Sequence, residues 1–305
     1  MTDQKLPGAM QSVRHREITA KSNGITYGVW TWTPDGYEDS DQPYPLLILL
    51  DGEMMMGTAI ETVALQAQLG ESKPVIVAGI STAQAAMHGV QRTIDYSAEV
   101  PTSAMLAAPR GVDQSFWKIY ETIASQLGIP FDDLFGGTDA FYSFMKDELL
   151  VELDGEFRID PEEIGIAGHS SGGDFAVDTL LRRQTPFSKF IISSFGTDVL
   201  DRTLAQRERA FSSTPVPRHL DVFCGYGGGE RSDPYLRDYI ERGIELIERL
   251  EKADPENLRA TIRGFDLETH GSVITHILSS AIRDLWGTGK GFVEVAFESG
   301  LASPG

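Results

Sequence analysis

The sequence predicts an α/β fold in which helices cover both faces of a mostly parallel sheet. Short apolar runs alternate with stretches of helical length from residue 45 to near the end of the chain. Several of these runs, such as Pro45–Leu50, are apolar at consecutive positions, which is typical of strands buried on both faces. No repeat or low-complexity linker divides the chain, so we expect one domain over residues 1–305.

The expected strands follow one another in a defined order. The first two, at 16–21 and 26–33, are joined by the turn Ser22-Asn23-Gly24 and are expected to pair antiparallel at the edge of the sheet. The final helix is expected over 271–286. The remaining strands are expected at residues 45–50, 74–80, 164–168, 189–194, 220–225 and 259–265.

Residues 97–136 interrupt the alternation and indicate an insertion. A helix is predicted within it because Asp113 can cap its start, apolar residues recur at helical spacing, and Gly128 can end it. Trp117 adds an apolar group beyond one stripe. Ligands of α/β proteins bind at the carboxyl ends of the strands, so we expect this helix to form a cap over a substrate pocket. The alternative is a surface helix packed on the body.

Composition excludes several classes of partner and site. The chain carries 26 basic and 45 acidic residues, a net charge of −19, so its surface field repels nucleic acid and anionic membranes. Cys224 is the only cysteine, which excludes an intramolecular disulfide and a thiolate-rich metal site. The amino terminus has no signal-like apolar segment, and no apolar run reaches the roughly 18 residues of a membrane span. We expect a cytoplasmic protein, and the sequence leaves its oligomeric state open.

The segment IGIAGHSSGG at 164–173 leads from a predicted strand into a predicted helix through the pattern G-x-S-x-G. In such a turn the serine is strained and projects from the sheet, and the flanking glycines leave room for it. Ser170 is therefore the predicted nucleophile, and the backbone N–H of Ser171 is a predicted oxyanion donor. His169 is expected to point away from the serine and pack. The alternative is a Gly- and Ser-rich turn that merely starts a helix.

A serine nucleophile of this kind needs a base, and the chain order Ser, acid, His places that base downstream. Three histidines qualify by position. His219 opens a predicted strand and His276 lies inside the predicted final helix, whereas His270 lies in the loop between the last strand and that helix. His270 is therefore the predicted base, and the alternative is a surface-loop histidine.

The acid is expected in the loop after the strand at 220–225, where Glu230 and Asp233 compete. Three glycines before Glu230 allow the sharp turn that would bring its carboxylate to the base. Asp233 precedes Pro234 and also fits a helix N-cap. Glu230 is favoured, with Asp233, Asp198 or a Ser–His dyad as alternatives.

Taken in order, five segments resemble the enterochelin-esterase-like esterase family of α/β hydrolases, which includes siderophore trilactone hydrolases and feruloyl esterases. The resemblance implies an α/β-hydrolase fold and a serine esterase that acts on a small-molecule ester through an acyl-enzyme, with no metal or organic cofactor. The segments are YPLLILLDG at 44–52, RTIDY at 92–96, IGIAGHSSGG at 164–173, the glycine and acid loop at 225–230, and THGSV at 269–273.

The resemblance also implies residues around the substrate. The second oxyanion donor is expected to be the backbone N–H of Glu53, just after the first segment. Arg92 is expected either to contact an anionic substrate or to form a salt bridge to Asp95 that shapes its loop. Met54 is expected to contribute to an apolar wall of the pocket, together with Trp117 of the insertion.

Hydrolysis of a siderophore ester or a related hydroxy-acid lactone is the function expected first. An acyltransferase or cyclase would use the same acyl-enzyme with an alcohol or amine in place of water. A non-catalytic binding protein is the third alternative, and the intact Ser170, His270 and acid loop argue against it. The sequence departs from the family pattern at 194–198 and in its longer insertion, and both surround the expected pocket, so the substrate stays open.

Overall fold

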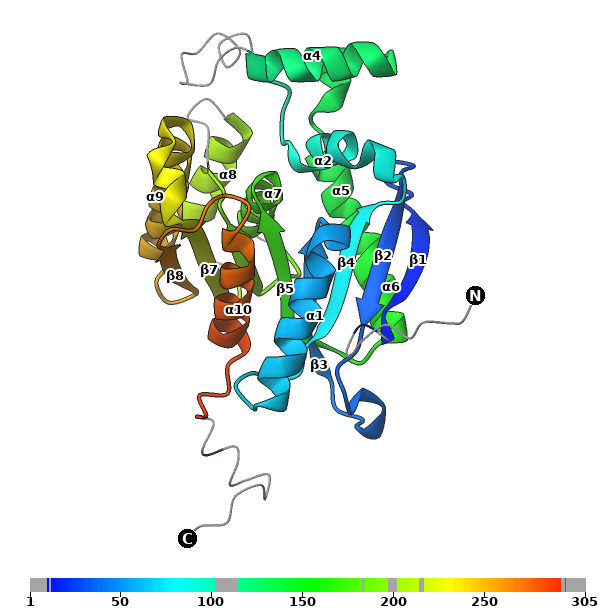
Figure 1. The fold of residues 1–305 in the computed structure, drawn as a ribbon, viewed down its shortest axis with the longest axis vertical. Coiled ribbons are helices and arrows are strands. Elements are labelled where there is room, and N and C mark those ends of the chain that lie inside the picture. Colours follow the sequence, from blue (N-terminus) through cyan, green and yellow to red (C-terminus); the bar gives the residue numbers. More distant parts are fainter. Residues whose placement is uncertain are drawn as a thin grey trace.

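The computed structural model describes residues 10, 12–101, 115–182, 184–196, 202–213, 217–291 and 294. Its strands are β1 Arg14–Thr19, β2 Thr26–Trp32, β3 Tyr44–Leu50, β4 Ile76–Thr82, β5 Ile159–His169, β6 Lys189–Ser193, β7 Leu220–Gly227 and β8 Leu258–Phe265. They form one sheet in the order β1-β2-β4-β3-β5-β6-β7-β8 (Figure 1). Strands β3 to β8 run parallel, and β2 pairs antiparallel with both β1 and β4. The expected α/β architecture and the antiparallel edge are confirmed.

Helices cover both faces of the sheet, as Figure 1 shows. They are α1 Gly52–Gln68, α2 His88–Tyr96, α4 Ser115–Leu127, α5 Thr138–Ser143, α6 Leu150–Glu156, α7 Ser171–Leu180, α8 Arg202–Ser212, α9 Pro234–Ala253 and α10 Val273–Trp286. On one face α1 and α10 pack over Leu47 and Leu49 of β3. On the other face α7 and α9 join the core around Leu46 and Ile48. All seven residues of β3 are buried, because neighbouring positions point to opposite, equally covered faces.

The helix predicted in the insertion is present as α4, beyond α2 and on the side where the parallel strands end (Figure 1). Gly128 ends it with a φ of 67°. Its link to the body is the short turn η4, Phe131–Leu134, where the Tyr120 ring lies 5.6 Å from that of Phe135. Leu127, one of the apolar residues at helical spacing in this insertion, is 39% exposed. Asp113 and the Trp117 side chain lie outside the described part of the chain.

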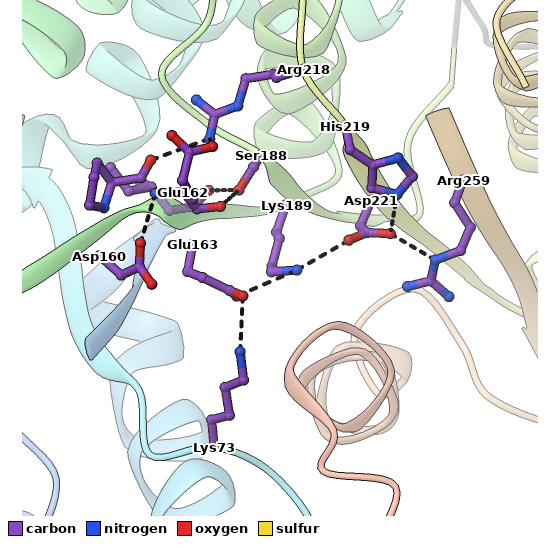
Figure 2. A network of polar contacts seen from close by, with 12 residues as sticks. Lys73, Asp160, Glu162, Glu163, Ser188, Lys189, Arg218, His219, Asp221 and Arg259 are labelled. Carbon is purple, nitrogen blue, oxygen red and sulfur yellow. Dashed lines mark hydrogen bonds and ion pairs between the residues drawn. The ribbon is translucent and has the colours of Figure 1, made fainter. Parts of the chain in front are cut away.

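A row of alternating charges crosses the amino ends of β5 to β8 (Figure 2). These ends lie away from the nucleophile turn, which follows the carboxyl end of β5. Lys189 lies in register with Asp221, which lies in register with Arg259. Lys189 Nζ is 3.5 Å from Glu163 Oε2 and 3.1 Å from Asp221 Oδ2, and Arg259 Nε is 2.7 Å from Asp221 Oδ1. Opposite charges at directly paired positions stabilise that register of the strands. This row therefore helps to fix the strands whose other ends carry the candidate site.

Candidate active site

Ser170 lies at the turn between β5 and α7 with φ 58° and ψ −125°, a strained conformation for a residue other than glycine. Its N–H donates to Ser193 O at 2.9 Å, and its carbonyl accepts from Asp174 N at 3.1 Å. A Cβ at Gly168 would lie 2.1 Å from Gly172 O, so only glycine permits this close approach. The predicted strained strand-to-helix turn is therefore present, with the serine at its apex.

His270 lies in the loop between β8 and α10, as predicted. The loop is held by hydrogen bonds from Thr269 N to Ser272 Oγ at 2.9 Å and from Val273 N to Thr269 O at 3.0 Å. Its imidazole ring lies 4.6 Å from the ring of His169, with 41° between their planes. Because His169 immediately precedes Ser170, this contact brings the predicted base to the nucleophile turn.

Glu230 contacts one ring nitrogen of the His270 imidazole. Glu230 Oε1 lies 2.5 Å from His270 Nδ1, while Oε2 accepts hydrogen bonds from Gly227 N at 2.6 Å and Ser194 Oγ at 2.9 Å. Burial alone would raise the pKa of this carboxyl, but the hydrogen bonds from His270, Gly227 and Ser194 outweigh it and hold the pKa below its ordinary value. The side chain is thus a buried carboxylate in hydrogen-bonding contact with the imidazole.

Asp233 occupies a different place. Its Oδ1 accepts a hydrogen bond from Leu236 N at 3.1 Å, which caps the first turn of α9. The structure therefore brings Glu230, and not Asp233, into contact with His270. Asp198, the other alternative, lies outside the described residues.

His169 packs as expected, and it also makes a polar contact that the sequence pattern did not indicate. Its Nδ1 lies 2.8 Å from Ser193 Oγ, and its ring packs against that of His270. Burial and the neighbouring His270 lower its pKa to about 4, so the ring is neutral at pH 7. Ser193 and Ser194 were also missed as site residues. Strand order is the signal that could have found them, because β6 lies between the strands that carry Ser170 and Glu230.

The two expected oxyanion amides lie at the first residues of two helices. Ser171 opens α7, and Glu53 is the second residue of α1. In this structure Glu53 N donates to Ser81 Oγ of β4 at 3.3 Å, a long hydrogen bond. The preceding Asp51 has a φ of 52°, so the turn that carries Glu53 is strained like the turn at Ser170.

Arg92 has its salt bridge with Asp51, so the alternative of a salt bridge to Asp95 is wrong. Arg92 Nε lies 2.9 Å from Asp51 Oδ1. Asp95 instead accepts hydrogen bonds from Tyr27 Oη at 3.0 Å and Gln91 Nε2 at 2.8 Å. Burial raises the pKa of Asp95 to about 7. The spacing within the RTIDY segment suggested a local pair, whereas in the fold Arg92 reaches Asp51 at the end of β3.

Met54, expected in the apolar wall of the pocket, differs in exposure from the two methionines that follow it. Met54 is 71% exposed on the first turn of α1, whereas Met55 and Met56 are buried in the core beneath it. Met54 alone of the three is thus available to a ligand. A small cavity beside the Asp51 turn has His88 in its lining. His88 Nδ1 lies 3.0 Å from Glu53 Oε1, so these two side chains are in contact.

No group of three or more His, Cys, Asp or Glu side chains in the described residues is arranged to hold a metal ion. Within the same part of the chain, no helix combines the length and the apolar character needed to cross a membrane. The side chains brought together at the site are a serine on a strained turn, two histidines in ring contact and a buried carboxylate.

The family is decided by a match over most of the chain. A family model described as "Putative esterase" matches residues 22–254. The chain belongs to this family. Membership confirms the resemblance found in the sequence and the predicted class of enzyme, a carboxylic ester hydrolase.

The individual relatives are distant in sequence, with identities of 24% or less. The ferri-bacillibactin esterase BesA of Bacillus subtilis (strain 168) is 24% identical over 271 residues, which are 88% of this chain and 87% of that protein. The BES protein from Bacillus cereus has a TM-score of 0.74 at 22% identity, covering 94% of this chain and 99% of its own. The siderophore hydrolase EstB from Aspergillus nidulans has a TM-score of 0.72 at 19% identity, covering 92% and 96%. These structures confirm the α/β-hydrolase fold.

Proposed function

We propose that this esterase uses a Ser170–His270–Glu230 triad and forms an acyl-enzyme on Ser170. The observation that carries the proposal is the 2.5 Å contact between Glu230 Oε1 and His270 Nδ1, beside the strained Ser170 turn. A carboxylate at Nδ1 keeps the proton on that nitrogen and leaves Nε2 as a proton acceptor. The imidazole is then in the tautomer that a general base requires.

The reaction follows in two halves. His270 Nε2 takes the Ser170 proton as Oγ attacks the ester carbonyl carbon, and the same proton passes to the departing alkoxide, leaving the acyl group on Ser170. A water then gives its proton to His270, attacks the acyl carbon and releases the acid, and the proton returns to Ser170 Oγ. Glu230 stays ionised throughout and stabilises the imidazolium.

The tetrahedral oxyanion is held by the amides of Ser171 and Glu53. Each donor of this kind is worth roughly 3 to 4 kcal/mol of barrier in a dry site. The Glu53 amide is engaged by Ser81 Oγ at 3.3 Å, so an oxyanion competes with a weak hydrogen bond and gains the amide at small cost. The substrate displaces this contact when it binds.

The substrate class we propose is a siderophore ester or a related hydroxy-acid lactone. The names of the distant relatives support it, because one is a ferri-bacillibactin esterase and another a siderophore hydrolase. The insertion at 97–136, with α4 beyond the strand ends, is proposed as the cap that contacts such a bulky ester (Figure 1). Replacing 105–127 by a Gly/Ser loop should then raise KM for the bulky ester far more than for p-nitrophenyl acetate.

The substrate proposal is tested with p-nitrophenyl acetate, a tricatecholate trilactone and a hydroxamate siderophore ester, each with and without ferric iron. Mass spectrometry of the products should show hydroxy-acid fragments that gain one water per cleaved ester. Ser170→Ala is the control and should release none. Cleavage of the aryl ester alone would reject the siderophore class and leave the esterase intact. Transfer to an added alcohol in preference to water would identify an acyltransferase.

A further inference from the structure

Arg92 of α2 joins two turns that follow the neighbouring strands β3 and β5. Its Nε donates to both carboxylate oxygens of Asp51, at 2.9 and 3.1 Å. One terminal nitrogen donates to His169 O at 3.0 Å, and the other to Ser171 Oγ at 3.3 Å. A single guanidinium therefore binds the turn after β3 and both neighbours of Ser170 after β5.

Both of these turns are strained, and each carries one of the two proposed oxyanion amides. Asp51 has a φ of 52° and precedes Glu53 by two residues, while Ser170 has a φ of 58° and immediately precedes Ser171. Strained backbone of this kind persists only where its surroundings hold it in place. The pairing of β3 with β5 sets the approximate separation of the two turns, and beyond the strand ends Arg92 connects the turns directly.

The surroundings of Arg92 commit it to this position. Asp51, its ionic partner, is 4% exposed and also contacts Tyr96, whose hydroxyl accepts from Asp51 N at 3.3 Å. The Tyr96 ring lies 5.5 Å from Arg92 Cζ. A Cβ at Gly172 would lie 3.3 Å from Asp51 Oδ2, which places this carboxylate against the first turn of α7. The positive charge of Arg92 is therefore neutralised within the protein.

We infer that Arg92 is a positioning residue that ties the Asp51 turn to the Ser170 turn and so fixes the two oxyanion amides relative to each other. It does not bind an anionic group of the substrate. The inference rests on the proposed function, because it assigns Arg92 to the transition state of that reaction. Losing an interaction made only in the transition state lowers kcat and leaves KM unchanged, whatever the charge of the substrate.

Lysine cannot replace Arg92 in this role, because one ammonium on a flexible stem cannot span three acceptors in fixed directions. Arg92→Lys and Arg92→Gln should each lower kcat about 10- to 100-fold on both p-nitrophenyl acetate, which is neutral, and p-nitrophenyl hemisuccinate, which is anionic. KM should stay within about threefold on both esters. Methylguanidinium added to Arg92→Gly should restore part of the lost kcat. Arg237→Gln, which removes an exposed cation from α9, is the matched control and should behave as wild type.

Asp51→Asn keeps Arg92 in the chain and serves if the Arg92 variants do not fold. Weakening the ion pair should lower kcat on both esters, whereas an anion-binding Arg92 would be set free and would lower KM for the hemisuccinate. A rise of tenfold or more in KM for the anionic ester alone in Arg92→Lys would overturn the inference, as would unchanged kcat on both esters. Wild-type protein that hydrolyses neither of these esters nor the siderophore esters would instead reject the proposed function.

Discussion

Glu230→Gln is the substitution that separates the two carboxylates of the acid loop. The amide keeps the shape of the side chain but removes its charge and one of its two acceptor oxygens. Three donors converge on the carboxylate, from His270 Nδ1, Gly227 N and Ser194 Oγ, at 2.5, 2.6 and 2.9 Å. The amide nitrogen must then face at least one of these donors, and if it faces His270 the imidazole shifts to the wrong tautomer.

The size of the expected loss follows from that tautomer. In a serine protease, replacing the triad aspartate by asparagine lowers kcat about 10⁴-fold with the geometry intact, which is about 5 kcal/mol of barrier. We expect Glu230→Gln to lower kcat on p-nitrophenyl acetate by about 10³- to 10⁴-fold, with KM nearly unchanged. Steady-state rates measured with enough enzyme to detect the residual activity provide the assay.

Asp233→Ala is the matched control for Glu230→Gln, from the same loop. It removes the hydrogen bond to Leu236 N and costs about 1 kcal/mol of stability, or roughly 2 °C in melting temperature for a chain of this size. Its kcat should stay within about threefold of wild type. A Glu230→Gln enzyme that keeps a tenth of the wild-type kcat, beside an Asp233→Ala enzyme that loses a hundredfold, would refute the assignment.

Two further predictions concern stability. Burial raises the folded-state pKa of Asp95 to about 7, so its contribution is fully present below about pH 4 and is lost progressively as pH rises to about 7, by up to about 4 kcal/mol in total. Urea unfolding of Asp95→Asn should lack this decline, and a pH dependence identical to wild type would contradict the prediction. Burial opposes ionisation of Asp221, but Arg259 and Lys189 lower its pKa, so its contribution is present at pH 7 and lost as pH falls below about 4. Lys189→Met should cost about 2 kcal/mol at pH 7 and less at pH 3, whereas Lys73→Met, at a half-exposed site, should cost under about 1 kcal/mol at either pH.

The sequence predicted Ser170 and His270 because each lies where a parallel strand ends, and such ends meet at one edge of the sheet. Adjacent strands also explain why Glu230, at the end of β7, reaches the loop after β8. Asp233 was the less favoured acid because its position also fits a helix N-cap, and in the structure it does cap α9. Local pattern was sufficient to predict where these residues lie; their roles stay predictions.

Contacts between distant segments could not be predicted in the same way. The partner of Arg92 depends on how α2 lies across the end of β3, and the sequence offered Asp95, three residues away, as the nearer carboxylate. The ring contact between His169 and His270 depends on the height of the β8–α10 loop above the sheet. The apolar stripe of α4 is only partly buried because the helix reaches the body through η4, a geometry that periodicity does not encode.

Covalent labelling by a fluorophosphonate tests the triad most directly. The wild-type chain should gain one adduct, which peptide mass spectrometry should locate on Ser170, and Ser170→Ala should gain none. His270→Ala should be labelled at least 100-fold more slowly, while His276→Ala, which alters an exposed histidine of α10, should be labelled at the wild-type rate. An adduct on another residue, or undiminished labelling of His270→Ala, would contradict the account.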